Sequence, residues 1–145
     1  MLASCGGDGS SREAWASQAD AICRPALAKL RVVKKRIDAT AAGGDPDVIF
    51  ARSADLLREG AAISRGAFDS IEALDEPGEE ADAADAWVAS NRRQAALTDE
   101  LAAAFDGQDD TRIARLSEAV DALEEANNAR ARRFGMSACA ERVQP

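Results

Sequence analysis

Residues 42–47 read Ala-Gly-Gly-Asp-Pro-Asp, and this short stretch decides how the chain folds. Two consecutive glycines end a helix, because glycine disfavours helix more than any residue except proline. Asp45 then offers an N-cap acceptor, and Pro46 fits the first position of a new helix. A turn this short makes the second helix run back along the first. The stretch therefore predicts a helical hairpin.

Apolar and small residues recur every three or four positions on both sides of this turn, a spacing typical of amphipathic helices. The stripe before the turn is Trp15, Ala19, Ile22, Ala26, Leu30, Val33 and Ile37, and the stripe after it is Ile49, Ser53, Leu56, Gly60, Ile63, Ala67 and Leu74. Ser10 and Glu13 have the spacing of a capping box that starts the first helix. Glycine inside a helix costs about 1 kcal/mol relative to alanine, so we expect Gly60 to let a neighbouring backbone approach closely.

The rest of the chain repeats this pattern of stop and restart. Pro77-Gly78 ends the second helix, Gly107 ends the third, and Asp109 or Asp110 caps the fourth. The third stripe is Ala83, Trp87, Ser90, Gln94, Leu97, Leu101 and Ala104, and the fourth is Ile113, Leu116, Val120, Leu123, Asn127, Ala131 and Phe134. Four amphipathic segments with short turns predict an all-α fold, an antiparallel up-and-down four-helix bundle. We expect a flexible tether over residues 1–10, a single domain over 11–145, and helices at about 11–42, 46–75, 79–106 and 110–134.

The composition excludes several classes of function. The 145 residues carry a formal net charge of -8 and include no histidine. An acidic chain lacks the clustered cations that phosphate backbones require, so nucleic acid is excluded as a partner. Histidine is the commonest metal ligand and the side chain best suited to proton transfer near neutral pH. Without it, and without a phosphate-binding or nucleophile motif, we expect no enzyme activity, no catalytic residues, no cofactor and no metal.

Polar residues interrupt the stripes of the third and fourth helices at one level. Pairing these helices around Gly107 places Ser90 and Asn91 near Asn127, with Gln94 about one turn away. Buried polar groups need hydrogen-bond partners, which the other members of this layer, water or a ligand could supply. We interpret the layer first as a device that fixes helix register. A small polar ligand between the two helices is the alternative.

Two charged runs have ordinary structural explanations. The acidic run consists of Asp75, Glu76, Glu79, Glu80, Asp82 and Asp85, and the basic run of Lys29, Arg31, Lys34, Lys35 and Arg36. The acidic run complements the N-terminal dipole of the third helix, with a weak divalent-cation site as the alternative. The basic run flanks the apolar seam of the first helix instead of forming one face, which favours solvent exposure over partner binding.

The first residues resemble an export and anchoring signal. Leu2-Ala3-Ser4-Cys5 resembles a bacterial lipobox, in which a signal peptidase cuts before a lipid-modified cysteine. The charged and apolar regions of a signal peptide do not precede these residues, so lipidation of Cys5 requires that Met1 is not the true start of the precursor. An accidental cysteine in the tether is the alternative.

Cys23 and Cys139 form the remaining pair of cysteines. In a bundle with an even number of antiparallel helices, the last helix ends beside the start of the first. Gly135 would end the fourth helix, and four further residues could bring Cys139 to Cys23. We therefore expect a disulfide, which an oxidising compartment allows. The alternative is two buried free thiols that behave as small apolar residues.

The two cysteine-bearing stretches also resemble a group of known proteins. Ala19-Asp20-Ala21-Ile22-Cys23 and Phe134-Gly135-Met136-Ser137-Ala138-Cys139 are similar to segments of a loose group of uncharacterised secreted helical lipoproteins from high-GC bacteria. The resemblance covers the two ends of the chain. It implies export and the disulfide, and it supplies no activity.

These observations predict an extracytoplasmic helical bundle with a binding or structural role, anchored to the cell membrane by a lipid on Cys5. The membrane is the one partner that the sequence identifies, and a protein or small-molecule partner stays open. The alternative is a cytosolic helical protein that carries free thiols and oligomerises through its apolar seam.

Overall fold

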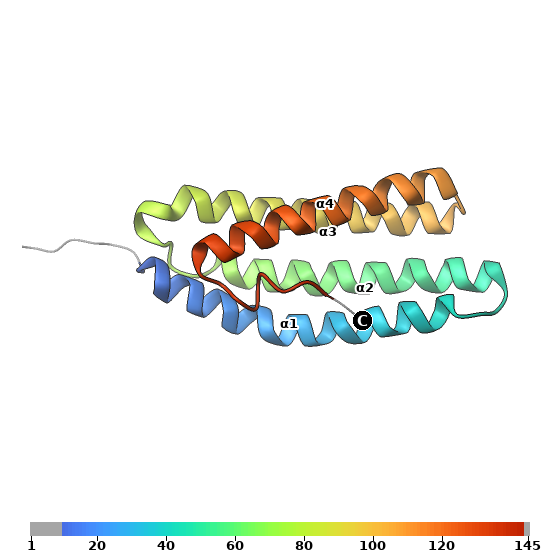
Figure 1. The fold of residues 1–145 in the computed structure, drawn as a ribbon, viewed down its shortest axis with the longest axis horizontal. Coiled ribbons are helices and arrows are strands. Elements are labelled where there is room, and N and C mark those ends of the chain that lie inside the picture. Colours follow the sequence, from blue (N-terminus) through green and yellow to red (C-terminus); the bar gives the residue numbers. More distant parts are fainter. Residues whose placement is uncertain (1–9, 144–145) are drawn as a thin grey trace, which may run out of the picture.

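The computed structural model describes residues 10–143, which form four long α-helices joined by short turns. The helices are α1 (Arg12–Ala41), α2 (Pro46–Glu72), α3 (Ala81–Asp106) and α4 (Asp110–Phe134), and a short 3-10 helix, η1, spans Gly78–Glu80. Consecutive long helices run in opposite directions and pack against each other (Figure 1). The predicted all-α four-helix bundle is therefore confirmed.

Side-chain caps begin α2 and α4 where the sequence predicts them. The Asp45 carboxylate accepts a hydrogen bond from the Asp47 N–H at 2.9 Å, and Pro46 occupies the first turn of α2. The Asp109 carboxylate accepts one from the Arg112 N–H at 2.9 Å. Each cap satisfies an N–H group that a helix start leaves without an intrahelical partner.

The helix α1 begins one residue later than the capping box predicts. The Ser11 Oγ accepts a hydrogen bond from the Ala14 N–H at 3.1 Å. Ser10 lies in the preceding segment, where its backbone N–H donates to the Glu76 carbonyl at 3.0 Å. This bond ties Ser10 to the turn between α2 and α3, so the predicted cap was wrong.

The turn between α2 and α3 is longer than the sequence predicts. The helix α2 ends at Glu72 instead of near residue 75, and η1 precedes α3. Pro77 has no N–H to donate, and Gly78 has a positive φ of 53°, which an α-helix cannot contain. The chain therefore enters α3 through a 3-10 turn, and the α-helix does not begin at residue 79.

The bundle is open along one side. The helix α2 packs against both α1 and α3, and α3 also packs against α4, whereas α1 and α4 barely contact each other. Figure 1 shows the chain after α4 turning back and running between α4 and α1 toward the middle of the bundle. We call this segment, residues 135–143, the strap. It replaces direct packing of α1 on α4 at this end of the molecule.

An aromatic cluster holds together the end at which α1 begins and α4 ends. The Trp87 side chain is 1% exposed, and its ring lies edge-on to Trp15 and Phe68, with centroids 6.0 and 5.2 Å away. Trp15 also packs on Phe134, with centroids 5.2 Å apart. These four rings come one from each helix. Because aromatic side chains bury large apolar areas, this cluster fixes the relative positions of all four helices.

The buried face of α1 differs from the predicted stripe. Cys23 and Leu27 are buried, whereas Ile22 and Ala26 are only half-buried. The strap explains the difference, because it packs on α1 through Cys139 and covers the face that carries Cys23. The spacing of apolar residues within α1 contains no information about this additional partner.

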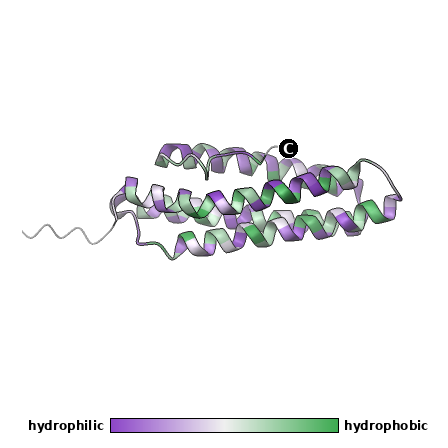
Figure 2. Cartoon of the chain, turned by 90° about the horizontal axis from the view of Figure 1, so that it is seen from below, coloured by the Kyte–Doolittle hydropathy of each residue, from purple (hydrophilic) through white to green (hydrophobic). Residues whose placement is uncertain are grey.

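Every helix mixes apolar and polar residues along its length. Figure 2 shows hydrophobic and hydrophilic positions alternating on each helix, with no helix that is hydrophobic throughout. Within residues 10–143, no helix combines the length and the hydrophobicity that a membrane span requires.

The expected close backbone approach at Gly60 was wrong. A methyl group placed on this residue would lie 3.7 Å from Leu30 Cδ2 and 3.8 Å from Val33 Cγ1, which are ordinary contacts with side chains. The neighbouring helix therefore leaves room for a small side chain. Gly60 carries the helix-propensity cost of glycine without a packing reason that requires it.

Replacing Gly60 by Ala should raise the free energy of unfolding by about 0.5–1 kcal/mol, because alanine loses less backbone entropy in a helix. Urea denaturation monitored by circular dichroism measures the change. Gly66→Ala is the matched control: it lies on an exposed face of α2 with no atom near the added methyl group, so it reports helix propensity alone. A Gly60→Ala protein less stable than the parent would contradict the free space described here.

Candidate functional site

The strap begins at a glycine that reverses the chain. Gly135 has a left-handed φ of 86°, and the Met136 N–H donates to the Ala131 carbonyl at 3.0 Å, which closes the last turn of α4. Beyond this point the side chains of Met136, Ala138 and Ala140 are buried. The strap is therefore part of the packed core and not a loose tail.

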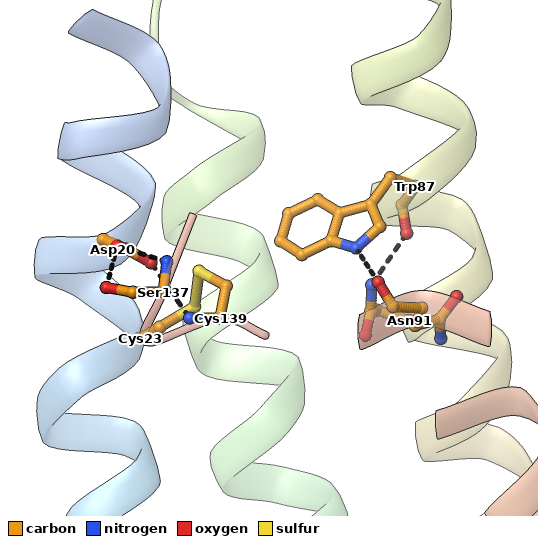
Figure 3. Close-up of a disulfide and its surroundings, with 7 residues drawn as sticks. Asp20, Cys23, Trp87, Asn91, Ser137 and Cys139 are labelled. Atoms are coloured by element: carbon orange, nitrogen blue, oxygen red, sulfur yellow. Dashed lines mark hydrogen bonds between the residues drawn. A yellow bond between two sulfur atoms is a disulfide. The ribbon is translucent and has the colours of Figure 1, made fainter. Parts of the chain in front are cut away.

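A disulfide joins the strap to α1. Cys23 and Cys139 are bonded, with their Cα atoms 5.2 Å apart and 116 positions apart in the sequence. The predicted pairing of these two cysteines is confirmed in the geometry, and it joins α1 to the segment after α4 (Figure 3). On the chain-entropy account, a cross-link over so long a loop stabilises the folded state by about 4–5 kcal/mol.

A buried carboxylate fixes the strap next to the disulfide. Asp20 is 6% exposed and lies one turn before Cys23 on the same face of α1. Its Oδ2 accepts hydrogen bonds from the Ser137 N–H at 2.8 Å and the Ser137 Oγ at 3.0 Å, and its Oδ1 accepts one from the Cys139 N–H at 3.0 Å (Figure 3). These donors satisfy backbone groups of the strap that would otherwise lack partners.

The hydrogen bonds at Asp20 also determine its charge state. Burial alone would raise the pKa of Asp20, but the N–H groups of Cys139 and Ser137 and the Ser137 hydroxyl stabilise the carboxylate. Together they lower the pKa of Asp20 below its ordinary value. The carboxylate is therefore ionised wherever the protein is folded near neutral pH.

Two ion pairs bridge the gap between α1 and α4 through consecutive strap residues. Glu141 pairs with Arg31 of α1, and the Arg142 Nε lies 3.8 Å from the Glu124 Oε2 of α4. The backbone N–H of Val143 also acts on the Glu124 carboxylate, whose pKa it lowers. The last residues of the strap therefore contact both α1 and α4.

Glu124 is the half-buried charge of this region. Desolvation raises its pKa above the ordinary value, the negative charge of Asp121 adds to this, and the Val143 N–H and Arg142 oppose it without cancelling it. A carboxylate with a raised pKa in a cleft is a candidate functional group.

A groove between α1 and α4 continues from the end of the strap. It encloses a cavity of about 310 Å³ with α2 and α3 as its floor. A smaller cavity of about 110 Å³ lies beside the disulfide, and Leu30, Gln94 and Glu124 line both spaces. Val143 also lines both, so the strap ends where the groove opens. We take this groove as the candidate functional site.

The groove combines apolar walls with a few charged groups. Its apolar lining is Leu30, Val33, Ile37, Leu56, Leu101 and Val120. Asp121 and Glu124 of α4 face it from one side, and Lys34 of α1 faces it from the other. The Lys34 Nζ is already held by Asp38 at 2.6 and 2.8 Å. The site is therefore apolar within and negative at its α4 side.

The predicted polar layer forms in part. The Asn127 side chain is 1% exposed, its Oδ1 accepts from the Ser90 Oγ at 2.6 Å, and its Nδ2 donates to the Gln94 Oε1 at 3.0 Å. Asn91 is not a member, because its Nδ2 donates to the Trp87 carbonyl of its own helix at 2.9 Å (Figure 3). Three polar side chains that bond one another across α3 and α4 favour the register interpretation over a ligand.

Three residues of the basic run and one of the acidic run form ion pairs within the protein. Arg31 and Lys34 form the pairs described above, and Arg36 pairs with Glu59 at 2.8 Å. In the acidic run, Glu80 contacts Arg12 at 3.4 Å. Among residues 10–143, no group of three or more Cys, Asp or Glu side chains is arranged to hold a metal ion. Cys5, the predicted lipidation site, lies outside the described residues.

Sequence reasoning missed Asp20 and Glu124. Asp20 lies within the stretch Ala19–Cys23. A single acid next to Ala19, which faces the core, was the feature that could have indicated a buried carboxylate. Glu124 follows Leu123, a member of the predicted α4 stripe, and nothing in its spacing distinguishes it from an exposed acid.

Comparison of the chain with family models, with curated proteins and with solved structures finds no match.

Replacing Asp20 by Asn should lower the free energy of unfolding by about 1–3 kcal/mol, because the strap donors lose a charged acceptor. The native pKa of Asp20 is depressed, so its contribution is present above the unfolded pKa and is lost as the pH falls through the native pKa. In urea denaturation, the gap between parent and Asp20→Asn should therefore narrow from neutral pH to about pH 3.

The control for Asp20 is Glu100→Gln, an exposed acid on α3, which should change stability little at either pH. Equal stability of the Asp20→Asn protein and the parent at neutral pH would show that the carboxylate does not hold the strap.

Replacing Asn127 by Leu alone should destabilise the bundle by about 1–3 kcal/mol, because Ser90 and Gln94 lose their partner inside the protein. The triple variant Ser90→Ala, Gln94→Leu, Asn127→Leu should recover most of this loss, since no unpaired polar group remains. Thermal and urea unfolding measure both variants. A triple variant as unstable as the single variant would mean that the three polar side chains contribute more to stability than the hydrogen bonds they make with one another.

Proposed function

We propose that this chain is an extracytoplasmic helical-bundle module, anchored to a membrane by a lipid on Cys5, that binds a partner molecule in the groove between α1 and α4. The observation that carries the proposal is the bond between Cys23 and Cys139. Disulfides of this structural kind persist in oxidising compartments and are rare in the reducing cytosol. The resemblance of the two cysteine-bearing stretches to secreted helical lipoproteins supports the same compartment.

The start of α1 at one end of the bundle suits a membrane anchor at that end. Six peptide links separate Cys5 from Ser11, the cap of α1, and an extended chain covers at most ~20 Å over that number. The disulfide lies near the same end of α1. An anchored bundle would therefore hold its strap end toward the membrane and its Gly43-Gly44 and Gly107 turns away from it. A lipidated cysteine with two or three acyl chains anchors a protein stably, whereas one chain does not.

The open groove supports a binding role. Leu30 and Ile37 of α1 are only half-buried along the groove, so a partner that covers them would gain free energy by burying apolar surface. A cavity of about 310 Å³ falls at the lower end of the range of small-molecule sites, and such sites have apolar walls with few polar groups. The competing function is a cytosolic protein that oligomerises through an apolar seam and keeps its thiols free.

Thiol titration separates the two functions. Protein taken from its native cell envelope without reductant and then denatured should show at most one free thiol, with two more appearing after reduction. Three free thiols before reduction would support the cytosolic alternative and overturn the proposal.

Mass spectrometry and detergent partitioning test the anchor itself. Cys5 should carry the added mass of a lipid, and Cys5→Ser should move the protein from the detergent phase to the aqueous phase. Cys23→Ser is the matched control, because it breaks the disulfide and should leave the protein in the detergent phase. Parent protein that already partitions into water would contradict anchoring.

A further inference from the structure

We propose that the groove between α1 and α4 binds an amphiphilic cation, a small molecule with one ammonium or guanidinium group and an apolar body. The inference deepens the binding role proposed above and rests on it. Three observations carry the inference. The cavity has an apolar lining, more carboxylates than cations face it, and the strap already lies at the end of the groove beside the disulfide.

The apolar body of the ligand would lie along α1 and the floor of the groove. Leu30, Val33 and Ile37 are spaced by three and four residues, so they form one ridge of α1 along the groove. Leu56 and Leu101 form the floor, and both are buried. An apolar chain in contact with these side chains would gain about 0.8 kcal/mol for each methylene group that it buries.

The cationic group of the ligand would bind at α4. Asp121 and Glu124 lie three residues apart, so both carboxylates are on the face of α4 toward the groove. Asp121 forms no ion pair within the described part of the chain. Glu124 has a long ion-pair contact of 3.8 Å with Arg142, and the Val143 N–H also stabilises its charge. Glu124, which is half-buried beside an apolar cavity, attracts a cation more strongly than an exposed carboxylate does, and the exposed Asp121 adds its negative charge on the same face of α4.

The other charges around the groove do not reverse this preference. Lys34 projects from α1, and Asp38 holds its ammonium group. Glu141 of the strap adds a third carboxylate at the smaller cavity beside the disulfide, and it pairs with Arg31. No charged residue of α2 or α3 lines the groove among the described residues. The carboxylates of α4 would repel an anionic ligand, and a neutral ligand would supply no charge to pair with Asp121 and Glu124.

The strap provides an internal example of this recognition. Val143 lines the groove, and the neighbouring Arg142 brings its guanidinium group to within 3.8 Å of the Glu124 carboxylate. An apolar residue and a cation of the strap therefore already lie together beside Glu124. A ligand of the same chemistry would extend this arrangement along the groove and compete with Arg142 for Glu124.

Calorimetry with three matched probes tests the inference on the full-length oxidised chain. Decyltrimethylammonium, decanol and decanoate share one apolar chain and differ in charge; the two ionic probes are used below their micellar concentrations and decanol below its solubility limit. The cation should bind about tenfold more tightly than decanol, and decanoate should bind most weakly. Acidification should weaken binding of the cation and not of decanol, because protonation removes the charge of Glu124.

Two substitutions assign the preference to residues. Glu124→Gln should lower the affinity for the cation about tenfold and leave decanol unchanged, whereas Glu118→Gln, an exposed acid of the same helix, should change neither. Arg142→Ala should tighten binding of the cation about two- to threefold, since it frees Glu124. Thermal unfolding verifies that each variant is folded, and Arg142 is exposed, so its removal should be tolerated.

Two results would overturn the inference, and they differ in what else they affect. Equal binding of all three probes, unchanged by Glu124→Gln, would leave the groove as a binding site and exclude the cationic class. Failure of every probe to bind would exclude the binding role of the groove as well. Neither result concerns the compartment, which the thiol titration decides separately.

Discussion

The return of the chain from the end of α4 to α1 is the constraint on which the rest of the molecule depends. Three helix pairs pack in sequence order, but α1 and α4 barely contact each other. The bond between Cys23 and Cys139, together with the donors held by Asp20, therefore closes the bundle. Without this connection α1 would be held by its packing on α2 and by the contacts of Trp15 in the aromatic cluster. A covalent bond and a buried carboxylate do here what packing of helix on helix does in a closed bundle.

The number and direction of the helices followed from the sequence because local signals determine them. Gly43-Gly44, Asp45-Pro46 and Gly107 act within a few residues, and the pairing of Cys23 with Cys139 followed from counting antiparallel helices. The candidate site did not follow, because it depends on contacts between distant segments. Glu124 has no local feature that separates it from an exposed acid. The strap determines which face of α1 is buried, and its Cys139 lies 116 positions from Cys23 of α1 in the sequence.

The charges on α4 explain why the groove stays open. Closing it would bring Leu30, Val33 and Ile37 against Asp121 and Glu124. Burying three aliphatic side chains contributes roughly 1.5–3 kcal/mol each at most, and these are already partly covered. Burying a carboxylate without a partner costs several kcal/mol. This cost offsets the gain, so closing the groove over Asp121 and Glu124 would stabilise the molecule little. On the proposal above, a ligand that brings both apolar surface and a cation avoids this cost, as Arg142 already does for Glu124 at one end of the groove.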